Sequence, residues 1–224
     1  MSRTMGTNII TGSSGFIGTK LAKQLGAYLI DKVTEDDLED CYLPPANTIY
    51  HLAALTSVQE SWKFPIDYSK DFTNLVRLVK IYPNAKIIYA QSASSINPAS
   101  PYGFSKWICG EYLKRFHKDY VICIFPNVWG GGKGVVDSFK DKNEVTIYGD
   151  GLQVRDFVHV DDIVEGLLLA KDWKCGEYSM GSGIGTRIID LAKGKKINFA
   201  PALKETRESI LSNTTPNWSP KIKI

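Results

Sequence analysis

The sequence of 224 residues has few cysteines, no hydrophobic run long enough to cross a membrane and no strong charge imbalance. Its 4 cysteines form no CxxC pair and no spacing typical of metal sites, so we expect reduced, structural thiols and no bound metal. No apolar stretch approaches the roughly 20 residues that span a bilayer, and the N-terminus lacks the apolar core of a signal peptide. A net charge of +3 without a long basic run gives no indication of nucleic acid binding. These absences predict a cytoplasmic protein that binds neither membrane nor nucleic acid.

The residues that are present are typical of a globular α/β protein. Hydrophobic residues make up 43% of the chain and charged residues 23%, which excludes a disordered chain. Short β-branched runs alternate with longer amphipathic stretches, a pattern that predicts βαβ units around a parallel sheet. The expected strands are residues 7–11, 28–31, 48–52, 86–91, 120–125 and 178–181. The expected helices are residues 15–25, 65–82, 102–118 and 160–171, with mostly loop over 31–46 and one further helix over 204–211.

Three glycines follow the first expected strand with the spacing GxxGxxG: Gly12, Gly15 and Gly18. Such glycines permit a tight turn, a close approach of the backbone to a pyrophosphate and close packing of the next helix on the sheet. The first turn of that helix then offers free N–H groups to phosphate. Asp31 ends the second expected strand, where a carboxylate can accept from both ribose hydroxyls and repel a 2′-phosphate. We therefore expect NAD rather than NADP as cofactor, the simpler alternative being a glycine loop followed by a solvated acid.

Tyr102 and Lys106 lie four positions apart in an expected helix, so their side chains share one face. A phenol with its ordinary pKa of about 10 is a poor base, but a nearby ammonium stabilises the phenolate and lowers that pKa. Tyr102 can then take a proton from a carbinol while a hydride leaves for the cofactor. Ser92, at the end of the preceding expected strand, can hydrogen-bond the same substrate oxygen. A YxxxK pair alone is often only a surface helix pair, but its order after the glycines and the serine favours a catalytic set.

The 3 histidines lack the carboxylate or thiol spacing of a metal site. We expect structural roles for them instead. His51 ends a strand and should make a structural hydrogen bond, His117 should lie at a helix end, and His159 should support the loop that carries Arg155.

Eight motifs occur in a characteristic order, at residues 11–18, 51–54, 92, 101–106, 126–130, 147–151, 153–162 and 181–183. With these motifs the chain resembles the extended short-chain dehydrogenase/reductases, specifically the NAD-dependent sugar-nucleotide epimerase/dehydratase family, in a shortened form similar to UDP-glucose 4-epimerase. The resemblance implies an α/β fold with a Rossmann-type doubly wound parallel sheet and a small, abbreviated C-terminal substrate lobe. It divides the chain into an NAD-binding core, residues 1–130, and a substrate lobe, residues 131–224, of which 152–183 return a strand and a helix to the core.

The resemblance also implies roles for individual residues. The implied catalytic residues are Ser92, Tyr102 and Lys106, with Tyr102 as acid/base and Lys106 holding the nicotinamide ribose and tuning Tyr102. The implied cofactor contacts are Gly12, Ser14, Gly15, Phe16, Ile17, Gly18, Asp31, Asp37, Leu38, Leu52, Ala53, Ala54, Tyr102, Lys106 and Pro126. The implied substrate contacts are Thr56, Ser92, Asn127, Tyr148, Gln153 and Arg155. Of these, Asn127 and Arg155 would meet the diphosphate, since a guanidinium fork matches phosphate oxygens.

Departures from the family pattern narrow the expected reaction. Ala93 and Ser94 follow Ser92 where the dehydratases of the family carry an Asp-Glu pair, so 4,6-dehydration is disfavoured, and Asp71 stands where an asparagine is common. We expect an NAD-dependent epimerase that acts on a nucleotide-diphosphate sugar at C4 through a transient 4-keto sugar. An NAD(P)-dependent keto-sugar-nucleotide reductase or dehydrogenase on the same scaffold, or a catalytically silent NAD-binding protein, stays an open alternative.

The chain is short for this family, and the missing segments can be placed. Residues 31–48 leave too little chain for the usual helix and strand, which predicts a sheet pared back at one edge. Residues 130–147 and those after 183 are also abbreviated, which predicts a minimal substrate lobe. A homodimer that pairs through the helices 65–82 and 102–118 is the assembly that the resemblance implies.

Overall fold

The computed structural model describes residues 7–30, 44–132, 134–204 and 209–224. Its main sheet has six parallel strands in the order β2-β1-β3-β4-β5-β9. The strands are β1 (Asn8–Thr11), β2 (Ala27–Ile30), β3 (Thr48–His51), β4 (Lys86–Ser92), β5 (Tyr120–Phe125) and β9 (Gly176–Ser179). β5 is an unbroken apolar run, buried from its second residue onward. Such a run is what a strand needs when helices cover both faces of a parallel sheet.

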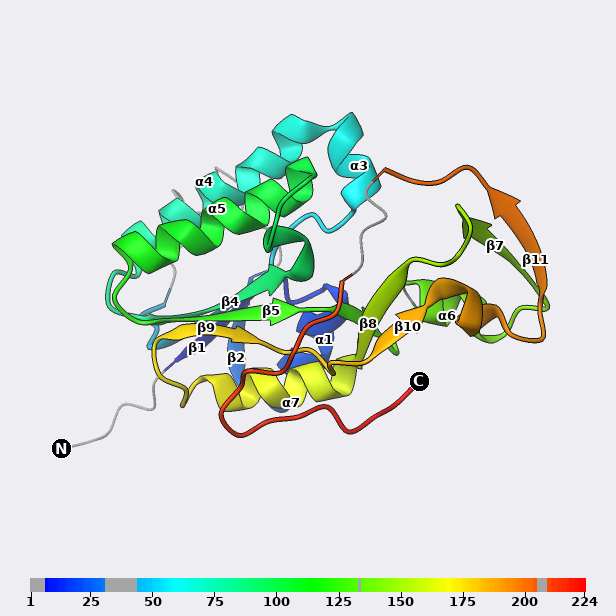
Figure 1. Ribbon diagram of the computed structural model, residues 1–224. Coiled ribbons are helices and arrows are strands. Elements are labelled where there is room, and N and C mark those ends of the chain that lie inside the picture. Colours follow the sequence, from blue (N-terminus) through cyan, green and yellow to red (C-terminus); the bar gives the residue numbers. More distant parts are fainter. Residues whose placement is uncertain (1–6, 31–43, 133, 205–208) are drawn as a thin grey trace.

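Helices cover both faces of this sheet (Figure 1). On one face lie α3 (Val58–Lys63), α4 (Pro65–Ile81) and α5 (Pro101–Phe116), and on the other lie α1 (Phe16–Gln24) and α7 (Val160–Ala170). Both α4 and α5 begin with a proline, whose fixed φ suits a first helical turn. Ser100 Oγ caps α5 by accepting a hydrogen bond from Gly103 N at 3.1 Å. The parallel sheet between two helical layers confirms the predicted Rossmann-type, doubly wound α/β fold.

A smaller lobe extends beyond the carboxyl ends of the main strands (Figure 1). It contains a three-stranded sheet of order β10-β8-β6 and a parallel pair, β11 with β7. Its elements are β6 (Asn127–Trp129), α6 (Val135–Lys140), β7 (Glu144–Tyr148), β8 (Val154–His159), β10 (Gly185–Arg187), the 3₁₀ helix η2 (Ile188–Ala192) and β11 (Lys196–Ala200). The buried side chains of this lobe form a small core of their own, made of Phe139, Val145, Ile147, Phe157, Ile188 and Ala192.

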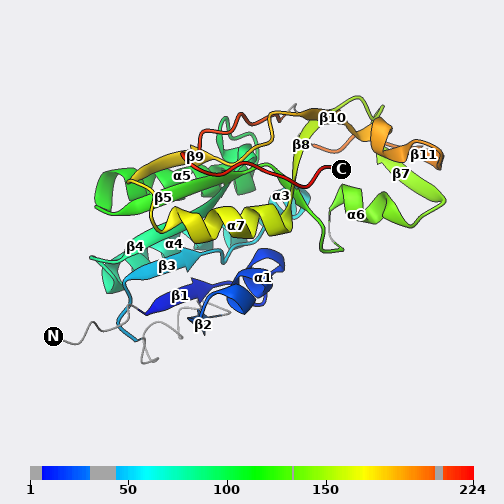
Figure 2. The same cartoon turned by 90° about the horizontal axis from the view of Figure 1, so that it is seen from below.

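Residues 209–224 form a C-terminal segment that lies beside α7 (Figure 2). Trp218 anchors this segment, since its ring packs against Gly166 and its Nε1 donates to the carbonyl oxygen of Asp162 at 2.8 Å. The carboxylate of Asp162 accepts hydrogen bonds from the backbone N–H groups of Lys221 and Ile222. The segment therefore belongs to the packed structure of the core and passes the substrate lobe on its way there.

The predicted elements of the main sheet are all present, with ends that differ by at most two residues. The predicted helix over 204–211 is wrong for its described residues, because Ser209 pairs with Arg155 in an isolated parallel bridge and Leu211 has no regular secondary structure. Most of the predicted loop over 31–46 lies outside the described residues, and β2 is the outermost described strand on that side. No helix within the described ranges is long and apolar enough to cross a membrane.

Candidate active site

The glycine turn between β1 and α1 is packed so tightly that side chains are excluded. Gly12 has a φ of +72°, and a Cβ there would lie 2.7 Å from the backbone nitrogen of Ala53. A Cβ on Gly18 would overlap the carbonyl oxygen of Gly12. α1 begins after Gly15, close to the carboxyl end of β1, and no side chain of a described residue caps its first N–H groups. This bare helix start beside an open turn fits the pyrophosphate of a dinucleotide.

A buried hydrogen bond joins the glycine turn to the neighbouring strand. Thr11 Oγ1 and His51 Nδ1 lie 2.7 Å apart, and Ala53 N donates to Thr11 Oγ1 at 3.3 Å. Burial, reinforced by the charge of Lys106, lowers the pKa of His51 to about 3, so the imidazole is neutral. His51 thus has the structural hydrogen bond that was expected, and it holds the 52–54 turn against Gly12.

The other two histidines also have structural contacts. His117 ends α5, and its Nε2 is 2.7 Å from the carbonyl oxygen of Ala85. His159 Nδ1 accepts from Asp161 N at 3.2 Å at the start of α7, and its ring packs edge-on against Trp129 at 4.6 Å. The described part of the chain has no group of three or more His, Cys, Asp or Glu side chains that can hold a metal ion.

Ser92 ends β4, and Tyr102 and Lys106 lie on α5, which packs against β4 and the 3₁₀ helix η1 (Ala93–Ser95). Lys106 is 3% exposed, and its Nζ donates to the carbonyl oxygen of Ala90 at 3.1 Å, two residues before Ser92. Ser92 Oγ accepts from Ser94 N at 3.2 Å and so starts η1. A Cβ on Gly103 would overlap the carbonyl oxygen of Ser94, because the first turn of α5 lies directly against η1. The strand-end serine and the Tyr-Lys pair therefore share one small region.

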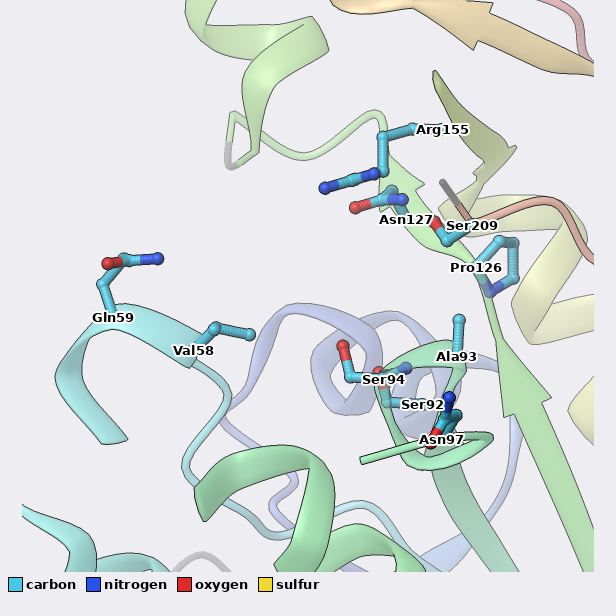
Figure 3. Close-up of a pocket in the computed structure, with 10 residues that line it drawn as sticks. All are labelled: Val58, Gln59, Ser92, Ala93, Ser94, Asn97, Pro126, Asn127, Arg155 and Ser209. Atoms are coloured by element: carbon cyan, nitrogen blue, oxygen red, sulfur yellow. Dashed lines mark hydrogen bonds between the residues drawn. The ribbon is translucent and has the colours of Figure 1, made fainter. Parts of the chain in front are cut away.

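A polar cleft opens beside this region (Figure 3). Its lining comes from α3, from η1 and the loop after it, from the start of β6, from β8 and from the C-terminal segment. The lining residues are Val58, Gln59, Ser92, Ala93, Ser94, Asn97, Pro126, Asn127, Arg155 and Ser209. Hydroxyl, amide and guanidinium groups dominate this set, as a sugar and its phosphates require. In Figure 3, Gln59 and Val58 lie across the opening from Asn127 and Arg155.

Several predicted site residues lie in this cleft and others do not. Ser92, Pro126, Asn127 and Arg155 belong to its lining, whereas Tyr102 and Lys106, and the predicted substrate contacts Thr56, Tyr148 and Gln153, do not. Tyr148 is 46% exposed, and its carbonyl oxygen accepts from Gln153 Nε2 at 3.1 Å in the substrate lobe. The predicted adenosine contacts Asp31, Asp37 and Leu38 lie outside the described residues. Ser14, Phe16 and Ile17 lie at the glycine turn and the start of α1, and Leu52 and Ala54 lie in the turn after β3.

Sequence reasoning missed the α3 side of the cleft and the residue from the C-terminal segment. Ser57 caps α3, with its Oγ accepting from Glu60 N at 3.1 Å, and the S-x-x-E spacing of this pair is a recognisable helix start. Gln59 Nε2 donates to the carbonyl oxygen of Lys204 at 2.8 Å, which ties α3 to the chain that leaves β11. Ser209 has no comparable signal, because only the folded chain brings it beside Arg155.

Asp156 is the buried acid that holds this side of the site together. It is 0% exposed, and its Oδ2 accepts from the N–H groups of Ser182, Gly183 and Leu211 at 2.9, 3.2 and 3.2 Å. Its Oδ1 accepts from Ser182 Oγ. The carboxylate therefore binds β8, the loop before β10 and the C-terminal segment to one another, next in sequence to Arg155.

Comparison with known proteins places this site in a family. The model of the NAD dependent epimerase/dehydratase family matches residues 30–180. A putative UDP-glucose 4-epimerase of Methanocaldococcus jannaschii is 30% identical over 218 residues, covering 82% of this chain and 70% of that protein. A UDP-glucose 4-epimerase of Mycolicibacterium smegmatis is 26% identical over 295 positions, covering 96% of this chain and 94% of that protein. That alignment is longer than this chain, so it contains internal gaps.

The solved structures agree with the sequence relatives. The crystal structure of the Thermotoga maritima UDP-glucose 4-epimerase with UDP-glucose has a TM-score of 0.87 and 25% identity, and covers 97% of this chain and 94% of that one. Similarity over nearly the whole length of both chains fits a shortened form whose missing residues are internal. Together with the glycine turn, the strand-end serine and the Tyr-Lys helix, these similarities show that the chain belongs to the NAD-dependent epimerase/dehydratase family.

Proposed function

We propose that this protein inverts a nucleotide-diphosphate sugar at C4, with NAD as a recycled cofactor. The observation that carries the proposal is the position of Ser92. It belongs at once to the lining of the polar cleft and to the strand whose backbone holds Lys106. A sugar in that cleft therefore lies next to a region that combines the phenol of Tyr102, the ammonium of Lys106 and the hydroxyl of Ser92. The relatives named above as UDP-glucose 4-epimerases support the same reaction.

The residues at the glycine turn suit NAD, which when bound supplies the acceptor and donor of the sugar's C4 hydride. Gly12, Gly15 and the first turn of α1 would hold its pyrophosphate, and Pro126 would lie beside its reactive ring. Asp31, Asp37 and Leu38 are proposed from the sequence as its adenosine contacts. Asp31 would favour NAD over NADP, because a carboxylate repels a 2′-phosphate.

Tyr102 moves the proton in this proposal. As phenolate it takes the proton of the C4 hydroxyl, while Ser92 Oγ donates a hydrogen bond to the same oxygen and Lys106 stabilises the phenolate. Loss of this proton and of the C4 hydride gives a 4-keto sugar. Return of the hydride to the opposite face of C4, and of the proton to the C4 oxygen, gives the epimer, so atoms and electrons balance without any added reductant. Burial of Tyr102 keeps bulk water from competing for the proton.

The cleft offers separate places for the phosphates and the sugar. Arg155 and Asn127 lie together on neighbouring strands β8 and β6, where they would bind the diphosphate. Ser94, Asn97 and Gln59 present hydroxyl and amide groups that match sugar hydroxyls. Thr56, Tyr148 and Gln153 stay in the proposal as substrate contacts outside the lining of the cleft.

Product analysis tests the proposal directly. The purified protein is incubated with UDP-, GDP-, CDP- and dTDP-sugars, and the products are identified by NMR. We expect one nucleotide sugar to convert to its C4 epimer without consumption of added NADH or NADPH. The Tyr102→Phe variant should retain bound NAD and lose turnover. Near wild-type turnover in Tyr102→Phe, or stoichiometric use of NADH with a keto-sugar, contradicts the proposal.

We also propose a homodimer that pairs through α4 and α5. Both helices have large apolar side chains that the folded chain leaves exposed: Ile66 is 76% exposed, Phe104 52% and Phe116 66%. Apolar side chains in such numbers on neighbouring helices are typical of a surface that binds another protein. A self-complementary pairing of the two helices would bury them in both copies.

A cytoplasmic location completes the proposal. Cys109 and Cys123 are buried free thiols, and burial raises the pKa of Cys109 to about 11, which leaves it inert. Unpaired thiols of this kind suit a reducing compartment. Fractionation of the native host's cells, with the protein recovered among soluble cytoplasmic markers, is the corresponding test.

A further inference from the structure

Asp71 is a half-buried acid that the proposed reaction does not use. It lies on the face of α4 that packs on α5. One turn before it, Tyr68 meets Tyr102 edge-on at 6.2 Å between ring centroids, and directly after it Phe72 meets Tyr112 at 5.6 Å. Asp71 therefore faces α5 between these two contacts. The residue of α5 that lies one turn beyond Tyr102 is Lys106.

The carboxylate of Asp71 is poorly satisfied. Its Oδ2 is closed off from solvent and accepts no hydrogen bond from any described residue. The backbone N–H of Leu55 donates to the carboxylate. Burial raises the pKa of Asp71 to about 6, while the charge of Lys106 and the Leu55 hydrogen bond act in the opposite direction. The carboxylate thus has one backbone donor, and the charge of Lys106 acts on it without a direct ion pair between the two side chains.

Other ionisable groups surround the same place. Helix α5 contributes Tyr102, Lys106 and Cys109. Tyr89 comes from β4, His51 from β3, Tyr68 from α4 and Glu60 from α3. Lys106 lies at the centre, with its Nζ 5.0 Å from the centroid of the Tyr89 ring. Its charge acts on Asp71, His51 and Cys109 alike. Of these three groups, Asp71 is the carboxylic acid and can therefore carry the negative charge that balances the ammonium.

We propose that Asp71 is the internal counter-ion of Lys106 and thereby sets the pH range in which Tyr102 acts as the base. Asp71 is a positioning residue, since it acts through Lys106. An ionised Asp71 balances part of the ammonium charge and makes the Tyr102 phenolate less stable. A neutral side chain at position 71 leaves the ammonium uncompensated, so the phenolate forms at lower pH.

The test measures the ionisation of Tyr102 and needs no turnover. Near-ultraviolet absorbance of tyrosinate is followed against pH in the NAD-loaded protein, and the same titration of Tyr102→Phe is subtracted. Asp71→Asn should move the Tyr102 titration down by about one pH unit, a tenfold change in acidity. Asp71→Ser, a second neutral variant, should give the same shift, and the charge-retaining Asp71→Glu should titrate like the wild type.

Asp67→Asn is the matched control. Asp67 lies one turn earlier on α4 and forms a solvent-exposed ion pair with Lys70 at 2.9 Å, so its neutralisation should leave the Tyr102 titration unchanged. If Tyr102 ionises at the same pH in the neutral Asp71 variants as in Asp67→Asn, within the error of the measurement, the proposal is overturned.

The role of Tyr102 as base rests on the proposed function, but the two can fail separately. A shifted titration in a protein that converts no nucleotide sugar supports the counter-ion and rejects the epimerase. Epimerase activity together with an unshifted Tyr102 titration supports the epimerase and rejects the counter-ion. In an active enzyme, kcat should rise with pH as Tyr102 ionises. The midpoint of this rise should move by the same amount as the absorbance titration, while KM stays near the wild-type value.

Discussion

Removal of the Asp156 carboxylate should destabilise the junction between β8, the loop before β10 and the C-terminal segment. Asp156→Ala leaves the half-buried N–H of Ser182 and the buried N–H of Leu211 without their acceptor, whereas Gly183 N keeps its second acceptor, the carbonyl oxygen of Leu211 at 3.0 Å. Each unsatisfied buried donor costs about 1–3 kcal/mol. The sum, about 2–6 kcal/mol, is a large part of the roughly 5–15 kcal/mol by which domains are stable.

Asp156→Asn separates the hydrogen bonds from the charge. The amide oxygen can accept from all three N–H groups, and the amide nitrogen can donate to Ser182 Oγ once that hydroxyl turns to accept. What is lost is the charge on the acceptor, which strengthens each bond to about twice its neutral value. Relief from burying a charge offsets part of this loss. We expect Asp156→Asn to cost about 1–3 kcal/mol, clearly less than Asp156→Ala.

Urea unfolding followed by tryptophan fluorescence measures both variants, because Trp218 is buried in the segment that Asp156 holds. Asp150→Ala is the control, because Asp150 is an exposed acid whose Oδ1 accepts one hydrogen bond, from the backbone N–H of Leu152. This variant should change the free energy of unfolding by less than about 0.5 kcal/mol. In an active enzyme, Asp156→Asn should raise KM more than it lowers kcat, because the cleft residues Arg155 and Ser209 move. An Asp156→Ala protein as stable as Asp150→Ala refutes the reasoning.

Three further predictions follow from the site. Because the pKa of His51 is lowered to about 3 in the folded state, the folded protein excludes a proton that the unfolded chain binds below about pH 6.5. The free energy of unfolding, measured relative to His51→Gln, should therefore fall by about 1.4 kcal/mol per pH unit as the pH drops from about 6 toward 3. Gly18→Ala places a Cβ against the carbonyl oxygen of the glycine turn and should weaken NAD binding by calorimetry about tenfold or more, whereas Gly26→Ala, whose Cβ meets nothing within 4 Å, should not. Phe104→Glu should give a monomer by light scattering, whereas Leu152→Glu, equally exposed on the lobe, should leave the dimer intact; a wild-type monomer at micromolar concentration contradicts the dimer.

The main sheet was predictable because its elements have strong local signals. β5 is a continuous apolar run, α4 starts at Pro65, and the glycines after β1 mark a turn too tightly packed for side chains. The substrate lobe was not predictable in the same way. β6 and β10 have three residues each and α6 has six, too few to show a period. Its small core forms only when these pieces meet.

The site divides along the same line. Ser92, Asn127 and Arg155 follow or belong to recognisable motifs, and the cleft includes them. Ser209 enters the cleft because Asp156 binds the backbone of Leu211, two residues later, and no local pattern announces that contact. The helix predicted over 204–211 failed for the same reason, since pairing with β8 outweighed the local preference of a short segment.

The central claim is that the sugar's own hydride leaves C4 and returns to the other face. The most direct measurement uses a nucleotide sugar with deuterium at C4, incubated with the purified protein in ordinary water without added NADH. The account predicts that the C4 epimer forms with deuterium still at C4, as read by NMR. A C4 epimer that has lost its deuterium to solvent, or that forms at an undiminished rate with Tyr102→Phe, would contradict it.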